Sequence, residues 1–454
     1  MGRPTEPPGP MGVLLCAAGL LAPPIAATAQ EELTGATMLS VAGPELLLTA
    51  PDDTTAIFSN CTYSRSTGTE LVLSYFYERV SDVADETLYR WSEGNARTWS
   101  DPVKVGEQLE LTAQPLLTLP SGPYVGGHAN PFRPERLVLG TARVLPEGMD
   151  PDVPQSYWTQ TGLTFALSTD DGRTLAPARP LVKQGAGSTE QHPFDGLYLG
   201  RNQVYALHRA LFLDADTVLV PAELSVLGED GALYNPHGWD FAQVVVLIGR
   251  RQGDTFGWDS SAPIRLDAFT ESTRGLNEPT LGRLADGGII MVLRGSNSFL
   301  PALPSRKWLS VSADEGQTWS YPQPWTYDDG DAFLSPSSIS HLVRHSSGRL
   351  FWFGNICPEN ADGNSPRYPL VVGEVDLRAG LLRRDTVTTI ADRTPDKSPQ
   401  IQYSNFSVYE DREAGEFVLD VTHYVPSGKP NRRQTAEAWT GNVYRYRIAV
   451  RRGV

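Results

Sequence analysis

The sequence is poor in the residues that define several common classes of protein. Only three cysteines occur in 454 residues, too few for a disulfide-rich scaffold, and none has the neighbours of a zinc site, so we expect no metal. Stretches with helical hydrophobic periodicity are scarce, so helix should be a minor component. The net charge of −15 disfavours nucleic acid as a partner, because a phosphate backbone requires a clustered basic surface. No phosphate-cradling glycine loop is present, and we expect no cofactor.

The first 29 residues have the features of an export signal. Arg3 supplies a thin positive region, residues 11–22 form an apolar run, and residues 27–29 have the small side chains of a cleavage site. Two prolines interrupt this run before the ~20 apolar residues that a membrane span needs, and no later stretch is long enough. We therefore predict a signal peptide over 1–29 and a secreted or periplasmic protein without a membrane span.

Removal of that leader would also remove Cys16. The remaining two cysteines are Cys61 and Cys357. They either form one disulfide or stay as two buried thiols, and the sequence is compatible with both arrangements.

A hairpin pattern recurs along the rest of the chain. Each unit is a turn rich in Gly, Asp or Ser followed by a short β-branched, aromatic or leucine-rich run. The six units lie at residues 66–75, 134–140, 214–220, 285–292, 346–353 and 412–419. Their spacing of roughly 60 to 80 residues exceeds one hairpin and suits a four-stranded sheet with its loops, which predicts a repeating all-β architecture.

A second repeat supports this periodicity. Residues 168–175 and 312–319 share the frame Ser-x-Asp-x-Gly-x-Thr-(Trp/Leu), and weaker copies occur at 92–99 and 253–256. The Asp can close a turn on its own backbone, the Gly can adopt positive φ, and the final aromatic can pack between strands. The repeat therefore indicates a fold rather than a chemistry.

This frame matches the Asp box of the sialidase superfamily, which the sequence resembles from about residue 56 to 424. The resemblance implies a six-bladed β-propeller over residues 31–454, with seven blades as the alternative. It also implies an exo-acting glycoside hydrolase whose partner is a glycan or polysaccharide, from which it removes a terminal acidic sugar, sialic acid or a relative.

Three segments resemble those that carry the family's site. Residues 275–294 correspond to the segment that presents Glu278 and Arg294, residues 365–370 supply Arg367, and residues 402–406 supply Tyr403. The two guanidinium groups would hold the carboxylate of the sugar. Glu278 would take the proton of the Tyr403 phenol, and a covalent intermediate on Tyr403 implies retention of configuration.

The resemblance also implies an acid in the segment 78–91, for which we choose Asp85. Its neighbours that could serve instead are Asp82 and Glu86. One family motif is missing, because residues 58–63 stand where Arg-Ile-Pro would supply a first clamp arginine. Arg65 and Arg79 are nearby but outside that position. A carbohydrate-binding propeller without activity is therefore a further alternative.

Histidines in the middle of the chain suggest a different reaction. A histidine can act as a general base near neutral pH. In propeller-shaped polysaccharide lyases, a His/Tyr pair removes the proton beside a uronate carboxylate while Arg neutralises that carboxylate. The candidates for this alternative are His128, His192, His208 and His237.

Overall fold

The computed structural model describes residues 37–81, 83–105, 116–144, 160–206, 208–434 and 436–452. In these residues the chain is all-β, and one 3-10 turn at Arg384–Thr386 is the only helical segment. None of the described helical segments has the length and hydrophobicity to span a bilayer. The predicted leader 1–29 and Asp82 lie outside the described residues.

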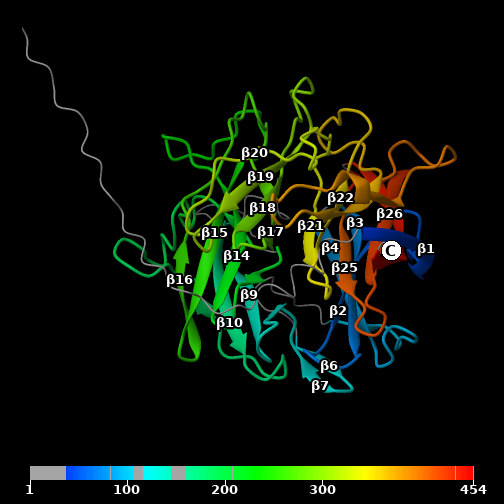
Figure 1. The fold of residues 1–454 in the computed structure, drawn as a ribbon, viewed down its shortest axis with the longest axis horizontal. Coiled ribbons are helices and arrows are strands. Elements are labelled where there is room, and N and C mark those ends of the chain that lie inside the picture. The colour runs from blue at the N-terminus through cyan, green and yellow to red at the C-terminus, as the bar shows by residue number, and fades with distance from the viewer. Residues whose placement is uncertain are drawn as a thin grey trace, which may run out of the picture.

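Four groups of strands each form a sheet with nearly sequential strand order (Figure 1). The first is β8 (His128–Ala129), β9 (Arg136–Val144), β10 (Gln160–Ser168) and β11 (Arg179–Pro180); the second is β12 (Val204–Tyr205), β13 (Leu211–Phe212), β14 (Thr217–Ser225), β15 (Ala242–Gln252) and β16 (Thr255–Ser260). The third is β17 (Asn277–Arg283), β18 (Ile289–Arg294), β19 (Lys307–Ser312) and β20 (Gln323–Pro324); the fourth is β21 (His341–Arg344), β22 (Leu350–Asn355), β23 (Leu370–Val375) and β24 (Thr388–Ala391).

The remaining strands form an eight-stranded sheet and one small hairpin. The large sheet contains β1 (Thr37–Leu48), β2 (Ala56–Tyr63), β3 (Leu71–Val80), β4 (Val83–Ser92), β5 (Val103–Lys104), β25 (Phe406–Glu410), β26 (Phe417–Pro430) and β27 (Glu437–Arg452). The hairpin is β6 (Leu117–Leu119) and β7 (Gly122–Tyr124). A single parallel residue pair, Ala56 with Gly441, joins β2 to β27, so the large sheet consists of two antiparallel groups.

The two ends of the described chain meet in one of these groups. Strand β1 pairs antiparallel with β27, from Thr37 opposite Arg452 to Leu48 opposite Val443, and Figure 1 shows blue β1 beside red-orange β26. A Cβ at Gly43 would lie 2.8 Å from the Arg445 carbonyl oxygen, so the register shift here requires glycine. The pairing closes the ring of sheets, and it places β27 between β26 and β1 while β1 forms the outer strand of this group.

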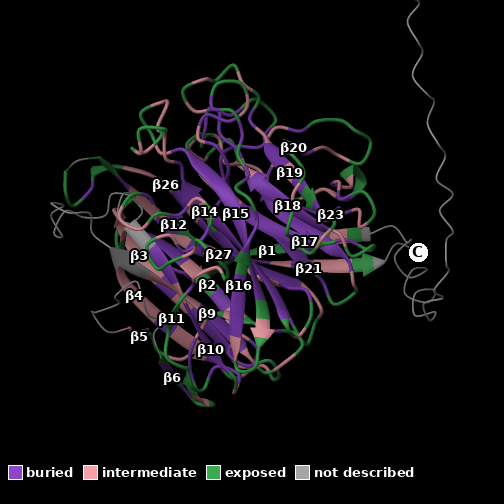
Figure 2. Cartoon of the chain, turned by 90° about the vertical axis from the view of Figure 1, so that its left-hand side faces the viewer, coloured by how far each residue is buried: buried purple, intermediate pink, exposed green. Residues whose placement is uncertain are grey.

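The hydrophobic core lies between consecutive sheets. One cluster joins Phe165 of β10 to Val220, Val245 and Trp258 of the next sheet, and the rings of Phe165 and Trp258 meet edge to face at 5.3 Å. Equivalent clusters join the later sheets. Figure 2 shows the buried strands running together through the middle of the molecule. Sheets packed side by side around a centre form a β-propeller.

The Asp boxes form the turns that the sequence predicts. In residues 312–319, the backbone N–H and hydroxyl of Thr318 donate to the Asp314 carboxylate at 2.8 and 2.6 Å, and the Gly316 N–H donates to Ser312 Oγ at 2.9 Å. Gly316 has φ +84°. Residues 168–175 repeat these contacts through Asp170, so the structural role of the box is confirmed.

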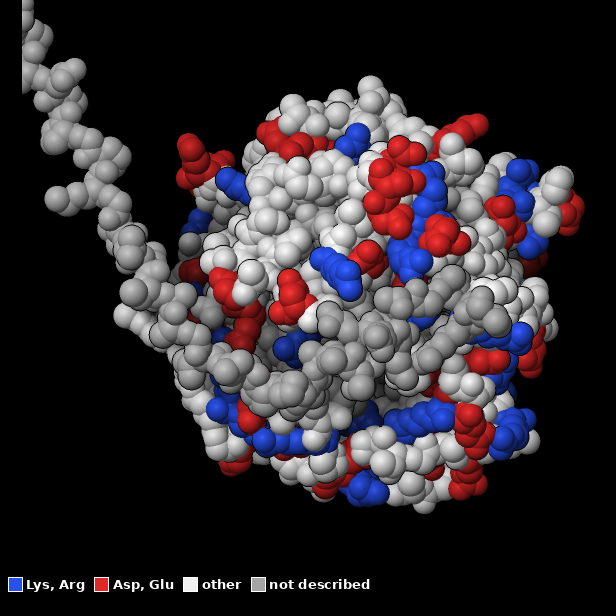
Figure 3. Space-filling view, viewed as in Figure 1, with Lys and Arg blue, Asp and Glu red and all other residues white. Residues whose placement is uncertain are grey.

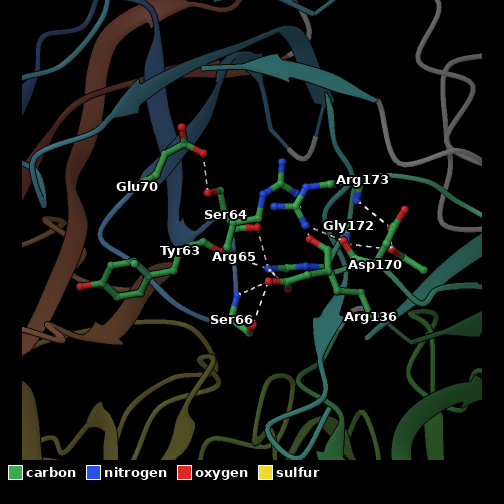
Figure 4. A network of polar contacts seen from close by, with 12 residues as sticks. Tyr63, Ser64, Arg65, Ser66, Glu70, Arg136, Asp170, Gly172 and Arg173 are labelled. Atoms are coloured by element: carbon green, nitrogen blue, oxygen red, sulfur yellow. Dashed lines mark hydrogen bonds and ion pairs between the residues drawn. The ribbon is translucent and has the colours of Figure 1, made fainter. Parts of the chain in front are cut away.

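Arg65 is part of the scaffold rather than of a carboxylate clamp. Its guanidinium donates to the carbonyl oxygens of Asp171 and Pro123 at 2.9 and 2.8 Å, and the Asp171 carboxylate accepts from the Ser66 N–H at 2.6 Å (Figure 4). Arg136 donates to the Ser64 carbonyl oxygen at 2.8 Å beside them. This network fixes the turn between β2 and β3 against the box turn that follows β10.

Cys61 and Cys357 are separate buried thiols, so they do not form a disulfide. Burial raises the pKa of each thiol to about 12. Both residues therefore act as small apolar side chains in the core.

A buried ion pair in the closing group provides a test of the fold. Asp420 of β26 and Arg445 of β27 face each other across the ladder, with Nε–Oδ1 and Nη2–Oδ2 distances of 2.7 and 2.8 Å. Asp420→Asn should lower the free energy of unfolding by about 3 kcal/mol, because it leaves a buried guanidinium without its counter-charge. Asp53→Asn, which breaks the exposed pair with Lys429, should cost less than about 1 kcal/mol. Urea unfolding of both variants would measure the difference, and equal losses would contradict it.

Candidate active site

Glu278 lies in an irregular stretch at the start of β17. The ladder between β17 and β18 shifts register between Asn277 and Thr280, and Glu278 has φ +45°. Such a conformation costs free energy in a residue with a side chain, and strained residues of this kind cluster at functional sites. The bulge brings the Glu278 carboxylate to the end of β18, where Oε1 lies 2.5 Å from Nη1 of Arg294.

Ser337 links the two predicted arginines. Its hydroxyl accepts from Arg294 Nε at 2.8 Å, and its carbonyl oxygen accepts from Arg367 Nη2 at 2.8 Å and Nε at 3.2 Å. Arg294 Nη2 also donates to Asn364 Oδ1 at 3.3 Å. The structure therefore brings Glu278, Arg294 and Arg367 together, as the sequence predicts.

The other side of Arg367 is held by neutral groups. Its Nη1 lies within 3.1 to 3.3 Å of Gln402 Oε1, Ser404 Oγ and the Tyr424 hydroxyl. The Tyr424 hydroxyl in turn donates to Gln402 Oε1 at 2.7 Å. The positive charge of Arg367 is thus oriented but not neutralised by these three residues.

Tyr403 does not join this group. Because successive side chains of an extended chain point to opposite faces, Gln402 and Ser404 face Arg367 while Tyr403 faces the core. Its side chain is fully buried, and its hydroxyl contacts the Asp392 carbonyl oxygen at 3.2 Å and Lys397 Nζ at 3.0 Å. The structure thus opposes the assignment of Tyr403 as nucleophile, since its phenol faces neither Glu278 nor the arginines.

Asp85 is likewise engaged elsewhere. Its side chain is 4% exposed, and Oδ1 lies 2.6 Å from Nη2 of Arg432, while Oδ2 accepts from the Arg79 N–H at 3.1 Å. These contacts join β4 to the turn between β26 and β27. Glu86 pairs with Lys104. No contact of either acid with Glu278 is found among the described residues.

A second carboxylate, which the sequence analysis did not select, lies next to Glu278. Glu223 of β14 accepts from the Glu278 N–H at 2.7 Å and from Asn277 Nδ2 at 3.0 Å, and His208 Nε2 lies 2.7 Å from its Oε1. Burial raises the pKa of Glu223, but the hydrogen bonds and the charge of His208 outweigh burial, so the pKa is lowered. Glu223 therefore stays ionised at neutral pH.

Only one of the four predicted histidines contacts a carboxylate of this cluster in the described structure. It is His208, whose ring also lies edge-on to Tyr205, 6.4 Å between centroids. His128 is half-buried, and the loss of solvent around its ring together with the charges of Arg209 and His208 lowers its pKa to about 4. His192 stacks on Tyr198, and His237 bonds to the Ala268 carbonyl oxygen.

Lys307 adds a buried positive charge that the sequence does not reveal. It stands opposite Arg294 in the ladder between β18 and β19, is fully buried, and its ammonium donates to the Ser338 carbonyl oxygen. Burial lowers its pKa to about 7; the charge of Glu278 opposes that shift, and the charges of Arg294 and Arg367 add to it.

The third basic side chain of a carboxylate-binding arginine cluster would come from the start of β2, where this chain has Phe58. Phe58 packs edge to face on Tyr424 with centroids 5.4 Å apart, and both rings are buried with Ala56. The apolar side chain of Phe58 thus lies beside the phenol that contacts Arg367. Arg79, the nearby alternative, lies 3.9 Å from Asp85.

Replacement of Tyr403 by Phe tests its position. Because the hydroxyl contacts only the Asp392 carbonyl oxygen and Lys397 Nζ in the described structure, Tyr403→Phe should cost about 1 kcal/mol of stability and leave any glycoside turnover within about twofold of wild type. Tyr424→Phe is the matched variant, since it removes the hydroxyl that contacts Arg367, and it should raise KM. Steady-state kinetics and urea unfolding of both proteins would decide between the two tyrosines.

The low pKa of Lys307 predicts a pH dependence of stability. Between pH 7 and about 10.5 the unfolded chain holds the Lys307 proton more tightly than the folded chain, so the folded state gains stability as pH rises, by up to about 1.4 kcal/mol per unit. Lys307→Met should abolish this gain. Unfolding measured at pH 7, 8 and 9 would show the two proteins diverging, whereas parallel curves would contradict the prediction.

Solved structures with a similar fold include glycoside hydrolases. The K499G mutant of NanB sialidase from Streptococcus pneumoniae is 14% identical, with 89% of this chain and 70% of that chain covered and a TM-score of 0.50. The GH93 alpha-L-arabinofuranosidase of Fusarium graminearum is 12% identical, with 91% and 98% covered and a TM-score of 0.45. At such identities the likeness concerns the fold, which is a sialidase-like β-propeller. The search of curated proteins found no match.

A family model gives the wider relationship. The model for a BNR repeat-like domain matches residues 151–413, more than half of the chain. This range contains both full Asp boxes and Glu278, Arg294, Arg367 and Tyr403. The resemblance predicted from the boxes is thus confirmed, and the chain belongs to the family of BNR repeat-like domains.

Proposed function

We propose that the protein is a glycoside hydrolase that removes a terminal acidic sugar, sialic acid or a relative, from a glycan. The observation that carries this proposal is the pair of guanidinium groups, Arg294 and Arg367, that Ser337 holds side by side next to Glu278. A guanidinium group matches the geometry of a carboxylate and binds it through two parallel hydrogen bonds.

The charges of the cluster favour an anionic ligand. Arg294, Arg367 and Lys307 bring two guanidinium groups and an ammonium with a pKa of about 7 to the carboxylate of Glu278, while the neighbouring carboxylate of Glu223 is already paired with His208. A buried or half-buried cation is stable only with a counter-charge or good hydrogen bonds. Within the described residues, Arg294 uses one N–H on each terminal nitrogen, so the second N–H of each is available to the carboxylate of a sugar.

Glu278 would take up a proton, and Glu223 would stabilise charge. Glu278 Oε2 is buried and accepts no hydrogen bond among the described residues, so it has a lone pair for a proton of an attacking water. The oxygen of that water would bond to the anomeric carbon as the glycosidic C–O bond breaks, and the leaving-group oxygen would take its proton from solvent water. Glu223 remains ionised through its three donors and would stabilise the positive charge that develops at the anomeric carbon. Most glycosidases use two carboxyl groups that differ in pKa and in their role in the reaction. The proposal therefore rests on Glu223 in place of Tyr403.

We also propose a six-bladed arrangement over residues 31–454. The four separate sheets and the two antiparallel groups of the large sheet would make the six blades. The leader 1–29 would direct export. On the face shown in Figure 3, basic and acidic side chains are interspersed, which suits a glycan better than a nucleic acid as partner.

Arginine variants test the carboxylate grip. Arg367→Lys keeps the charge but loses the fork of N–H groups, so kcat/KM on a fluorogenic sialoside or uronide should fall at least about 100-fold. Arg283→Lys, on the same strand as Glu278 but bonded to the Leu213 carbonyl oxygen, should behave as wild type. An arabinofuranoside, which lacks a carboxylate, should not be cleaved. Equal activity of both variants, or cleavage of the arabinofuranoside alone, would refute the proposal.

A lyase is the second candidate, and His208 favours it. His208 and Glu223 form a buried pair, and Tyr205, opposite Glu223 in the ladder, is 52% exposed. This His/Tyr pair could remove the proton beside a uronate carboxylate. A lyase would yield an unsaturated product that absorbs in the ultraviolet and would lose that product in His208→Gln. A hydrolase yields free sugar without absorbance, and a non-catalytic binding propeller yields neither.

A further inference from the structure

One arginine reaches across the centre of the ring of sheets. Arg209 lies between β12 and β13, which both pair with β14 of the second sheet, and its Nη2 donates to the Val408 carbonyl oxygen of β25. Along the chain, the third and fourth sheets separate the second sheet from the group of β25, β26 and β27. The first sheet and the group of β2 to β5 separate them in the other direction. The Arg209 side chain therefore spans the middle of the ring.

Arg209 faces an internal passage. The residue is exposed, yet loss of solvent lowers the pKa of its guanidinium to about 10. A side chain on the outer surface would keep its water, and one in the core would have no accessible surface. An arginine with accessible surface but little water around it lies in a channel enclosed by protein, and a propeller has such a channel at its centre.

Arg209 has no counter-charge within the part of the chain that the structure describes. Its hydrogen bond there goes to a neutral carbonyl oxygen, and its pKa is shifted by loss of solvent and by no carboxylate. The carboxylate of Glu223 is already held by His208, the residue before Arg209. Because an enclosed cation without a counter-charge destabilises a fold, this position favours the binding of an anion.

Two neutral histidines border the guanidinium. Loss of solvent and then the charge of Arg209 lower the pKa of His128 to about 4 and that of His341 to about 3. His128 Nδ1 accepts from the Ala210 N–H at 3.3 Å, so the ring proton of neutral His128 is on Nε2. That N–H has no acceptor among the described residues, whereas the His341 ring bonds to the backbone of Phe406. His128 thus adds a free donor beside the free N–H groups of Arg209.

We propose that a monovalent inorganic anion such as chloride binds in the central channel between Arg209 and His128. Both residues offer N–H donors, and the single positive charge of Arg209 is neutralised by a single negative charge. A divalent anion such as sulfate would leave a net negative charge in the channel and would cost more to dehydrate.

The anion would stabilise the ring of sheets and take no part in the reaction. His128 belongs to β8 of the first sheet, Arg209 to the second sheet, and Val408 to the group that closes the ring. One ion would therefore join segments that are far apart in the sequence. The site shares no residue with the cluster around Arg294, so the inference does not rest on the proposed function.

The dependence of stability on chloride tests this inference in the full-length protein. The Tm should be higher in sodium chloride than in sodium gluconate of equal ionic strength, since gluconate is too large for the channel. Above the Kd it should rise by roughly 1 to 2 °C for each tenfold increase in chloride. Arg209→Met should abolish the difference and be at least as stable as wild type in gluconate, because it removes an enclosed cation.

Arg201→Met is the matched control. The Arg201 guanidinium also donates to one backbone carbonyl oxygen, that of Gly231, but it lies on the exposed surface. This variant should keep the full chloride effect. If the bond from Arg209 to Val408 were the whole role of Arg209, Arg209→Met would lose the same stability in both salts, and that result would overturn the inference.

The line width of chloride-35 NMR measures binding without unfolding. Wild-type protein should broaden the signal more than Arg209→Met does, and bromide should reverse the excess while sulfate should not. His128→Phe removes one neutral donor and should weaken binding severalfold, which keeps the test available if Arg209→Met does not fold. Equal broadening by wild type and both variants, or displacement of chloride by sulfate and not by bromide, would contradict the proposed site.

Discussion

The site depends on the attachment of three cations to one short segment. Arg294 and Arg367 bond to the two oxygens of Ser337, and Lys307 bonds to the carbonyl oxygen of Ser338. Arg294 and Lys307 come from adjacent strands of one sheet and Arg367 comes from the loop before β23, so the segment sets their mutual distances. Because like charges repel, these fixed acceptors and the Glu278 carboxylate are needed to keep them together without a ligand. The arrangement is preorganised for an anion and costs little rearrangement when one binds.

The anchoring of these basic groups also determines how the two neighbouring carboxylates are held. A cluster rich in positive charge attracts a carboxylate, and Glu278 is held in it by direct contact with Arg294. Glu223 is held by a different set of donors, one of which is the backbone of Glu278. The irregular backbone of Glu278 therefore positions two carboxylates at once. A single substitution in that bulge would therefore shift the positions of both carboxylates.

The sequence predicts turns whose contacts lie within a few residues. It misses the position of side chains that depends on which face of a strand a residue occupies or on which strands pair. The box turns follow from side chains that bond within eight residues, and they are found as expected. Tyr403 was misplaced because a one-residue difference in register reverses the facing of a side chain, and its neighbours Gln402 and Ser404 face the site instead. Lys307 and the pair of His208 with Glu223 become visible only when neighbouring segments of a sheet are paired in register. The charge of Glu223 and of Lys307 within otherwise apolar strands was the one available signal.

The pairing of β1 with β27 has a consequence for how the molecule is made. The strands that close the ring are separated by nearly the whole described chain, since Thr37 lies opposite Arg452. Strand β1 must therefore wait during synthesis until β27 is complete before this pairing can form. The intermediate sheets can assemble in order through contacts between neighbours, whereas closure requires a contact of very large sequence separation, which is slow to form. An open ring with one exposed strand edge is thus the species that a chaperone or a protease would meet during synthesis.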